Sequence, residues 1–286
     1  MGQLRNRMET DLKIAGYSPC TRRIYLLYAE QYARHFWRSP EAMGAEEIRQ
    51  FLLFLIERRK VSSSTVRQVR AALKFLYTVT LNRAIEVDWL PMPRRPRPLP
   101  VILSGSEVLA LLNQICSIKY RTVLMVMYAA GLRIAEACRL RPECIDSRRM
   151  LIHVKQGKGR IDRYTILSRR LLGSLREYWQ AVRPPSEWLF PGRTSDRPLG
   201  IESVRSVFHL AVEAAGIHKA VTPHSLRHAF ATHLLECGTS VMVIRALLGH
   251  SSVSTTQVYT KVRPELLART QSPLDVLGTP KARVLG

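Results

Sequence analysis

Two segments of the sequence place arginine and histidine where they could bind a phosphate group. Arg133 comes directly after a nearly all-apolar stretch, YRTVLMVMYAAG, which ends at Gly131. In TPHSLRHAFATHLLECG, His224 and Arg227 are three residues apart and share one face of the predicted helix. A guanidinium binds phosphate through paired hydrogen bonds, and an imidazole beside it titrates near neutral pH. A lone arginine at a helix end is usually a surface residue, but the two segments together could form a site for phosphate chemistry.

A third polar segment, IRALLGHSSVSTTQVYTKV, contains the candidate nucleophile. A helix is expected to end at Gly249, His250 follows it, and Tyr259 lies nine residues beyond His250. On its own, a tyrosine in a short amphipathic helix is usually a core residue. Taken together with the arginines and histidines of the other two segments, however, Tyr259 is the candidate oxygen nucleophile.

The histidines also allow a second interpretation, in which His224, His228 and His233 bind zinc. The segment lacks the glutamate of an HExxH motif and the charge of Arg227 would repel a cation, so we do not favour this site. The five cysteines form an odd set without a CxxC pair, and we expect them to be reduced and mostly buried. No bound metal and no cofactor are therefore expected.

Hydrophobic spacing predicts that these segments belong to a mainly α protein. Apolar residues recur every three or four positions through residues 1–90, which predicts four helices. Residues 91–100, PMPRRPRPLP, contain five prolines and three arginines and are expected to form an extended basic linker. Two strands are expected at 151–155 and 161–167, because apolar and polar residues alternate on both sides of the turn QGKGR. Further helices are predicted at 168–182, 201–215, 224–237, 240–248 and 252–260.

The chain is accordingly expected to form two basic domains. A helical domain over 1–90 and the linker precede a mixed, mostly helical domain with a small antiparallel β-sheet over 101–270, and a tail over 271–286. Residues 1–100 contain 18 Lys and Arg against 9 acidic residues, and the remainder contains 26 against 13, which gives a net charge of +22. This balance indicates a polyanionic partner. Since no apolar run is long enough to span a bilayer and the charged start is unlike a signal peptide, we expect a cytoplasmic protein without membrane contact.

Taken together, the motifs resemble those of the tyrosine recombinase family, with its lambda-integrase-like and Xer-like members. The resemblance rests on five motifs in order: AAGLRIAE with Arg133, GKG with Lys158, HSLRH with His224 and Arg227, LLGH with His250, and Tyr259. It is strong over residues 101–265 and looser before them, where it implies a SAM-like core-binding domain. The stretch 176–191 is too short for the extra segment of integron integrases, so the chain resembles a general integrase.

The resemblance implies an enzyme that cuts and rejoins DNA at specific sites. Tyr259 would attack a phosphodiester to give a 3′-phosphotyrosyl bond and a free 5′-hydroxyl, which later attacks a partner strand without metal or ATP. Arg133 and Arg227 would stabilise the charge of the transition state. Lys158 would protonate the leaving oxygen, with Lys155 as the second choice. His224 would act as the base or as a proton relay, and His250 would donate a hydrogen bond to the phosphate. Glu136 would orient Arg133.

Double-stranded DNA with specific recombination sites is the partner that the resemblance implies. The expected DNA-binding residues outside the catalytic set are Arg67, Arg70, Arg94, Arg95 and Arg97. We expect a monomer or weak oligomer in the free state and a homotetramer on two synapsed sites. The setting implied is the nucleoid of a bacterial cell, where the enzyme would integrate, excise or transpose a mobile element. Three alternatives remain: a type IB topoisomerase, a DNA-binding protein without catalysis, and a zinc-dependent hydrolase.

Overall fold

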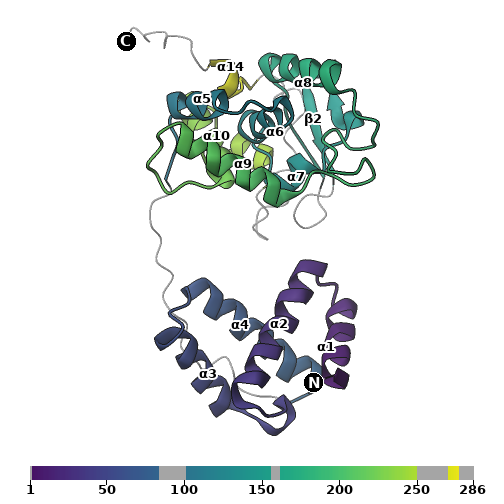
Figure 1. Ribbon diagram of the computed structural model, residues 1–286, viewed down its shortest axis with the longest axis vertical. Helices are drawn as coiled ribbons and strands as arrows, with labels where there is room; N and C mark the ends of the chain where they lie inside the picture. The colour runs from purple at the N-terminus through teal and green to yellow at the C-terminus, as the bar shows by residue number, and fades with distance from the viewer. Residues whose placement is uncertain (1, 84–100, 156–161, 250–269, 277–286) are drawn as a thin grey trace. The chain divides into compact units, whose positions relative to one another are not determined.

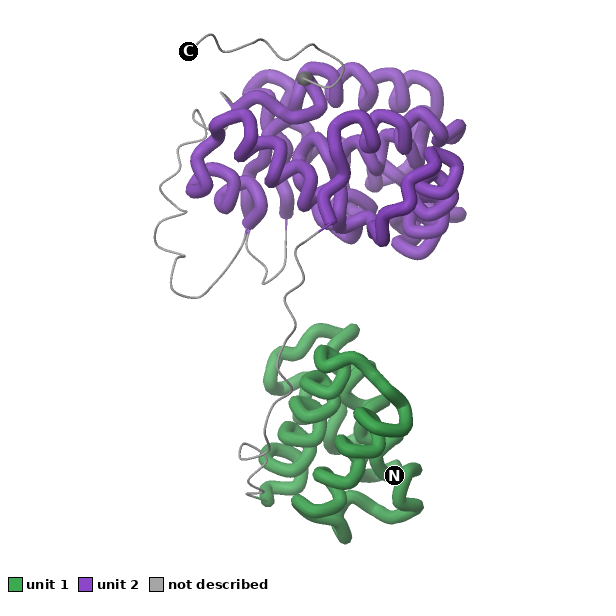
Figure 2. The backbone as a smooth tube through the Cα atoms, turned by 90° about the vertical axis from the view of Figure 1, so that its left-hand side faces the viewer, with its two compact units in different colours: residues 1–98 green, residues 99–286 purple. Residues whose placement is uncertain are grey.

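The chain divides into two compact units, residues 1–98 and residues 99–286 (Figure 2). In the computed structural model, the residues described are 2–83, 101–155, 162–249 and 270–276. The expected linker at 91–100 lies outside them, and each unit is therefore considered by itself. No helix within the described ranges is long and apolar enough to cross a membrane.

The first unit consists of helices, as the hydrophobic spacing predicted. Serine hydroxyls define two of the helix starts: Ser18 accepts a hydrogen bond from the Thr21 amide and Ser62 accepts one from the Thr65 amide, both at 3.2 Å. The apolar faces meet in one core around Tyr32, Phe51 and Leu73. The elements are α1 (Gly2–Ile14), α2 (Pro19–Phe36), the 3-10 helix η1 (Pro40–Ala42), α3 (Ala45–Glu57), α4 (Ser63–Phe75) and the π-helical segment η2 (Leu76–Thr80).

The second unit is mostly helical with a small sheet, which confirms the predicted fold class. Its three strands form an antiparallel sheet in the order β1-β2-β3, and the two expected strands are its β2 and β3. The short strand β1 was not predicted. The elements are α5 (Gly105–Asn113), α6 (Ile118–Ala129), α7 (Ile134–Cys138), η3 (Pro142–Cys144), β1 (Ile145–Asp146), β2 (Leu151–Val154), β3 (Arg163–Ile166), α8 (Arg169–Val182), α9 (Ile201–Ala214), α10 (Pro223–Glu236), α11 (Val241–Leu248) and α14 (Pro273–Val276).

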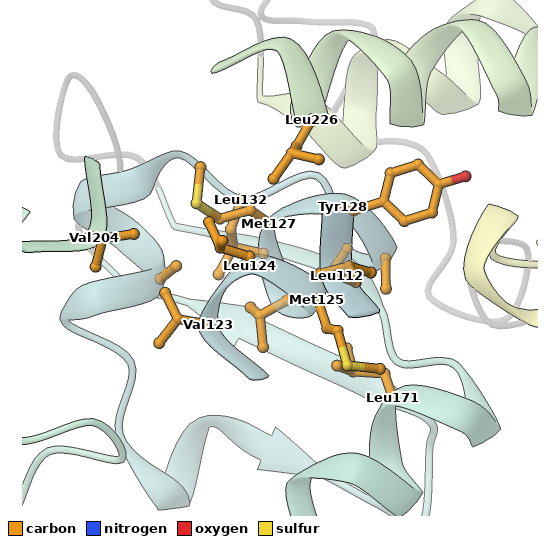
Figure 3. Close-up of a cluster of buried hydrophobic side chains, with 14 of the residues drawn as sticks. Leu112, Val123, Leu124, Met125, Met127, Tyr128, Leu132, Leu171, Val204 and Leu226 are labelled. Carbon is orange, nitrogen blue, oxygen red and sulfur yellow. The ribbon is translucent and has the colours of Figure 1, made fainter. Parts of the chain in front are cut away.

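Helix α6 is the centre of the second unit, surrounded by α5, α8, α9 and α10 (Figure 1). Its side chains from Thr122 to Ala129 are all buried, as expected for a helix that is apolar on every face. In the core, Leu124 and Met127 of α6 lie close to Leu132, and Leu226 of α10 approaches from above (Figure 3). The segment that follows α6 is thus anchored on a rigid core.

The last described segment, 270–276, packs on the body of this same unit. Leu274 of α14 is buried in the core, and the Ser272 hydroxyl donates to the Ala129 carbonyl of α6 at 2.7 Å. The Arg170 amide of α8 donates to the Asp275 carboxylate at 3.1 Å. Residues at the start of the expected tail are therefore part of the packed structure.

The cysteines differ from expectation in one respect. All five are free thiols, but Cys20, Cys116 and Cys237 are exposed and only Cys138 and Cys144 are buried. The expectation of mostly buried thiols is wrong, because three of the five lie on helix ends or connections that face solvent.

Candidate active site

Arg133 is held by a tight turn at the end of α6 and by the start of α7. Gly131 has a positive φ of 64°, and a Cβ there would lie 2.5 Å from the ring of Phe230 on α10. The Thr165 hydroxyl of β3 donates to the Ala130 carbonyl at 2.7 Å and secures the same turn. Arg133 then stands at the N-cap position of α7 and leaves 23% of its side chain exposed.

Arg227 of α10 is the most deeply buried charge among the described residues, with 2% of its side chain exposed. Its two terminal nitrogens donate to the carbonyls of Gly131 and Leu248, which join the turn after α6 to the end of α11. The carboxylate paired with it within the described ranges is Glu136, at 3.8 Å. Arg227 therefore lies beside Arg133 with little negative charge of its own to balance it.

Glu136 of α7 is the centre of this group. Its carboxylate accepts hydrogen bonds from the Arg133 amide at 2.8 Å and from the Arg133 guanidinium at 2.7 Å, so the predicted contact between the two residues is confirmed. Arg163 at the start of β3 donates two further bonds to the same carboxylate, at 3.0 and 2.7 Å. Three guanidinium groups, those of Arg133, Arg163 and Arg227, thus share one carboxylate, and we call these three residues the arginine group.

The pKa values follow from this crowding of like charges. Burial alone would raise the pKa of Glu136, but the hydrogen bonds and charge of Arg163, together with Arg133, lower it to about 2. Burial, together with the positive charges of Arg133 and Arg163, lowers the pKa of Arg227 to about 9. With these pKa values Glu136 and Arg227 are both ionised at neutral pH, and three guanidinium groups face one carboxylate in a partly desolvated place. Such a site favours an anion.

His224 lies on the first turn of α10, one turn before Arg227. Partial desolvation lowers its pKa, and the neighbouring His228, Arg227 and Arg133 lower it further. The imidazole is therefore neutral at pH 7 and able to accept a proton.

The three histidines of α10 do not form one cluster. The rings of His224 and His228 pack edge to face at 4.6 Å, whereas His233 hydrogen-bonds the Tyr128 hydroxyl at 2.9 Å. Among the residues that the structure describes, no group of three or more His, Cys, Asp or Glu side chains is arranged to hold a metal ion.

The predicted site residues are thus described in part. The structure brings together Arg133, Glu136, His224 and Arg227, while Lys158, His250, Tyr259, Arg94, Arg95 and Arg97 lie outside the described residues. Arg67 and Arg70 are partly buried on α4 of the first unit. Sequence reasoning missed Arg163, since an arginine at the first position of a short strand carries no pattern that links it to Glu136.

A basic cleft of about 570 Å³ opens beside Arg133, and this too was not expected. Its lining includes Arg139, Arg141, His153 and Lys155. The Arg141 guanidinium lies over the ring of Trp188 at 4.8 Å, and the Lys155 ammonium pairs with Glu143 at 2.6 Å. The cleft therefore extends the positive charge of the arginine group toward the sheet.

Comparison with known proteins decides the family. The model of the "Phage integrase family" matches residues 102–265, and that of the "Phage integrase, N-terminal SAM-like domain" matches residues 4–87. The chain belongs to the phage integrase family. Like its relatives, it is a tyrosine recombinase, a DNA-cleaving and rejoining enzyme of site-specific recombination.

Its relatives match along nearly the whole chain. The "Putative integrase/recombinase y4qK" of Sinorhizobium fredii is 42% identical, over 98% of this chain and 91% of the relative. The tyrosine recombinase XerA of Thermococcus kodakarensis is 36% identical, over 92% of each chain. Among solved structures, a lambda integrase tetramer bound to a Holliday junction has the same fold, with a TM-score of 0.68 and 18% identity over 90% of this chain and 76% of that one.

Proposed function

We propose that this integrase cuts and rejoins DNA through a 3′-phosphotyrosyl intermediate on Tyr259, without metal or ATP. The oxygen of Tyr259 attacks the scissile phosphorus, the bond to the 5′-oxygen breaks, and that oxygen takes up a proton. The 5′-hydroxyl of a partner strand then attacks the phosphotyrosyl bond and releases the tyrosine. Because one phosphate ester replaces another in each step, no external energy source is required.

The observation that carries this proposal is the shared carboxylate of the arginine group. Arg227 is almost fully buried, yet its paired carboxylate is 3.8 Å away and binds two other arginines more closely. A buried guanidinium without a close anion is costly, unless a ligand supplies the charge. A phosphate in the transition state of strand cleavage carries that charge on its non-bridging oxygens, where Arg133 and Arg227 would bind it.

The proton transfers are assigned to two further residues. His224, which is neutral at pH 7, accepts the proton of Tyr259 or relays it, since a tyrosine with a pKa of about 10 does not ionise unaided. Lys158 protonates the leaving oxygen. Lys155 is the weaker choice, because its hydrogen bond to Glu143 raises its pKa and makes it a poorer acid at neutral pH. His250 donates a hydrogen bond to the phosphate, and Glu136 orients Arg133.

The DNA partner is double-stranded and contains specific recombination sites. The basic cleft beside Arg133 supports this proposal, since Arg139, Arg141 and Lys155 suit a phosphate backbone that continues from the scissile position. On the first unit and the linker, Arg67, Arg70, Arg94, Arg95 and Arg97 are proposed as further DNA contacts.

The assembly we propose is a homotetramer on two synapsed sites, with a monomer or weak oligomer in the free state. Recombination exchanges four strands, one for each protomer, and the lambda integrase tetramer on a Holliday junction has the same fold. The biological reaction is proposed to be the integration, excision or transposition of a mobile element.

Covalent trapping tests the chemistry. The protein is incubated in excess EDTA with nicked duplexes built from the DNA that flanks its own gene, and adducts that resist SDS are resolved by electrophoresis. Wild type should form an adduct and Tyr259→Phe should form none, although it binds the same duplexes, because that substitution removes the nucleophile and leaves the arginine group intact. An adduct that persists in Tyr259→Phe would sink the assignment, and an adduct that disappears in EDTA would indicate a metal-dependent reaction.

A further inference from the structure

We propose that Arg163 is a positioning residue for DNA cleavage: it offsets the charge of Glu136 and ties the end of α11 in place, so that Arg133 and Arg227 stay available to bind the phosphate. The proposal rests on the phosphotyrosyl mechanism above. It concerns a residue that neither the motifs nor the catalytic set includes.

The guanidinium of Arg163 uses all its nitrogens within the site. Two donate to the Glu136 carboxylate in parallel, at 3.0 and 2.7 Å, which is the strong bidentate arrangement of an arginine and a carboxylate. The third, Nε, donates to the Leu247 carbonyl at 2.9 Å. Only 8% of the Arg163 side chain and 8% of the Glu136 side chain are exposed. Water therefore screens the pair weakly.

Arg163 offsets part of the Glu136 charge, and this weakens the attraction of the carboxylate for the other two arginines. Without Arg163, the carboxylate would keep its hydrogen bonds to Arg133 and its proximity to Arg227, at 3.8 Å, with its full negative charge. It would then compete with the phosphate for both guanidinium groups. With Arg163 bound bidentately, the carboxylate still orients Arg133 but opposes its charge less.

Arg163 also fixes the end of α11, the helix that leads into the LLGH motif. Gly249 ends this helix with a φ of 60°, and a Cβ there would lie 2.7 Å from Cδ of Arg163. Leu247 accepts from Arg163 while the next carbonyl, of Leu248, accepts from Arg227. The end of α11 is thus held by two arginines from two different elements, β3 and α10.

Single-turnover cleavage at saturating DNA, beside DNA affinity measured without cleavage, separates positioning from binding. We expect Arg163→Ala to lower the cleavage rate by about 10- to 100-fold, as for other residues that orient a reactive group, and to change the affinity little. Arg163→Lys should recover part of the rate, since it restores the charge but not the paired hydrogen bonds. Arg205→Ala is the matched control, because Arg205 pairs with Glu202 three residues away on the exposed face of α9 and should lose little.

A neutral scissile linkage shows whether Arg163 acts through the phosphate charge. On a methylphosphonate duplex one non-bridging oxygen is replaced, so the charge that Arg133 and Arg227 bind is removed. If Arg163 keeps Glu136 from competing with the phosphate for Arg133 and Arg227, the rate ratio of wild type to Arg163→Ala should shrink on this substrate. A ratio that is the same on both linkages would overturn the electrostatic role.

A double variant guards against a simple folding defect. Arg163→Met leaves Glu136 buried without its main partner, whereas Glu136→Gln together with Arg163→Met removes both charges. We expect the double variant to cleave faster than Arg163→Met alone, with circular dichroism of both variants as a check on folding. Equal rates in the two variants, or a wild-type rate in Arg163→Ala, would overturn the proposal. If wild type formed no Tyr259 adduct, that result would instead overturn the mechanism on which the proposal rests.

Discussion

The two units of this integrase bury polar groups of opposite kinds. In the described part of the first unit, the fully buried side-chain hydrogen bonds join uncharged groups: the Tyr32 hydroxyl lies 3.1 Å from that of Tyr77, which donates to the Pro40 carbonyl at 3.0 Å. No lysine or arginine between residues 2 and 83 is buried. In the second unit Arg227 is buried, and Arg163 and Glu136 are nearly so.

Exposed positive charge suits binding to a phosphate backbone, whereas buried positive charge suits the stabilisation of a transition state, as proposed above for the second unit. Both units are basic, and an exposed arginine in either could meet a phosphate backbone while staying hydrated. Among the described residues, positive charge that is held away from water and exceeds that of its carboxylate partner occurs only in the second unit, and there a phosphate would gain most from it. The net charge of the chain indicates its partner, while desolvated charge indicates the proposed place of the reaction.

The largest effect expected from this contrast is that of Arg227→Ala. Cleavage at saturating DNA should fall by roughly 100-fold or more, the usual loss when a transition-state donor is removed. DNA affinity should change little, because the side chain is buried and contributes little to the outer surface. Rates from single turnover and affinities from gel shift check this. If both fall equally, Arg227 is a binding residue and the contrast between the units fails.

In the first unit the corresponding substitution should affect stability and leave chemistry unchanged. Tyr77 donates to Pro40, so Tyr32 must donate to Tyr77, and Tyr77→Phe leaves both the Tyr32 hydroxyl and the Pro40 carbonyl without this partner. We expect a loss of about 1–3 kcal/mol in the free energy of unfolding, against about 1 kcal/mol for Tyr32→Phe. Urea unfolding of the full chain, with hydrogen exchange to locate the opening, measures both. The order of the two losses is the test, and a reversed order would contradict this hydrogen-bond direction.

The fold was largely predictable because its signals are local. Helical spacing predicted α1 to α4 of the first unit and α8 to α11 of the second, and the alternation of apolar and polar residues predicted β2 and β3. The expected helix at 252–260 lies outside the described residues. Strand β1 has two residues and owes its place to pairing with β2, so it has no pattern of its own.

For the site, the sequence predicted only the residues that lie within recognisable motifs. Arg133, Glu136, His224 and Arg227 were predicted because the motifs that contain them resemble those of the family, and the structure brings these four residues together. Arg163 was missed because its contacts with Glu136 and Leu247 cross 27 and 84 positions of the chain. The burial of Arg227 likewise depends on the turn after α6 and the end of α11, which no local pattern joins to α10.

The smallest effect expected is a change in pH dependence, and it again separates the units. His224 has a lowered pKa, so its neutral form persists below the usual 6.5, and kcat/KM should fall only when the pH drops below that lowered value. In His228→Gln one of the neighbours that lower the pKa of His224 is lost, so that pKa rises and the acidic limb should move toward higher pH.

The buried hydroxyls of the first unit have raised pKa values and do not titrate in this pH range, so the hydrogen bonds of that unit should be unaffected. A limb at or above pH 6.5, or one that His228→Gln leaves in place, would assign the titration to a group other than His224. Since Glu136 titrates only near pH 2, it does not account for such a limb.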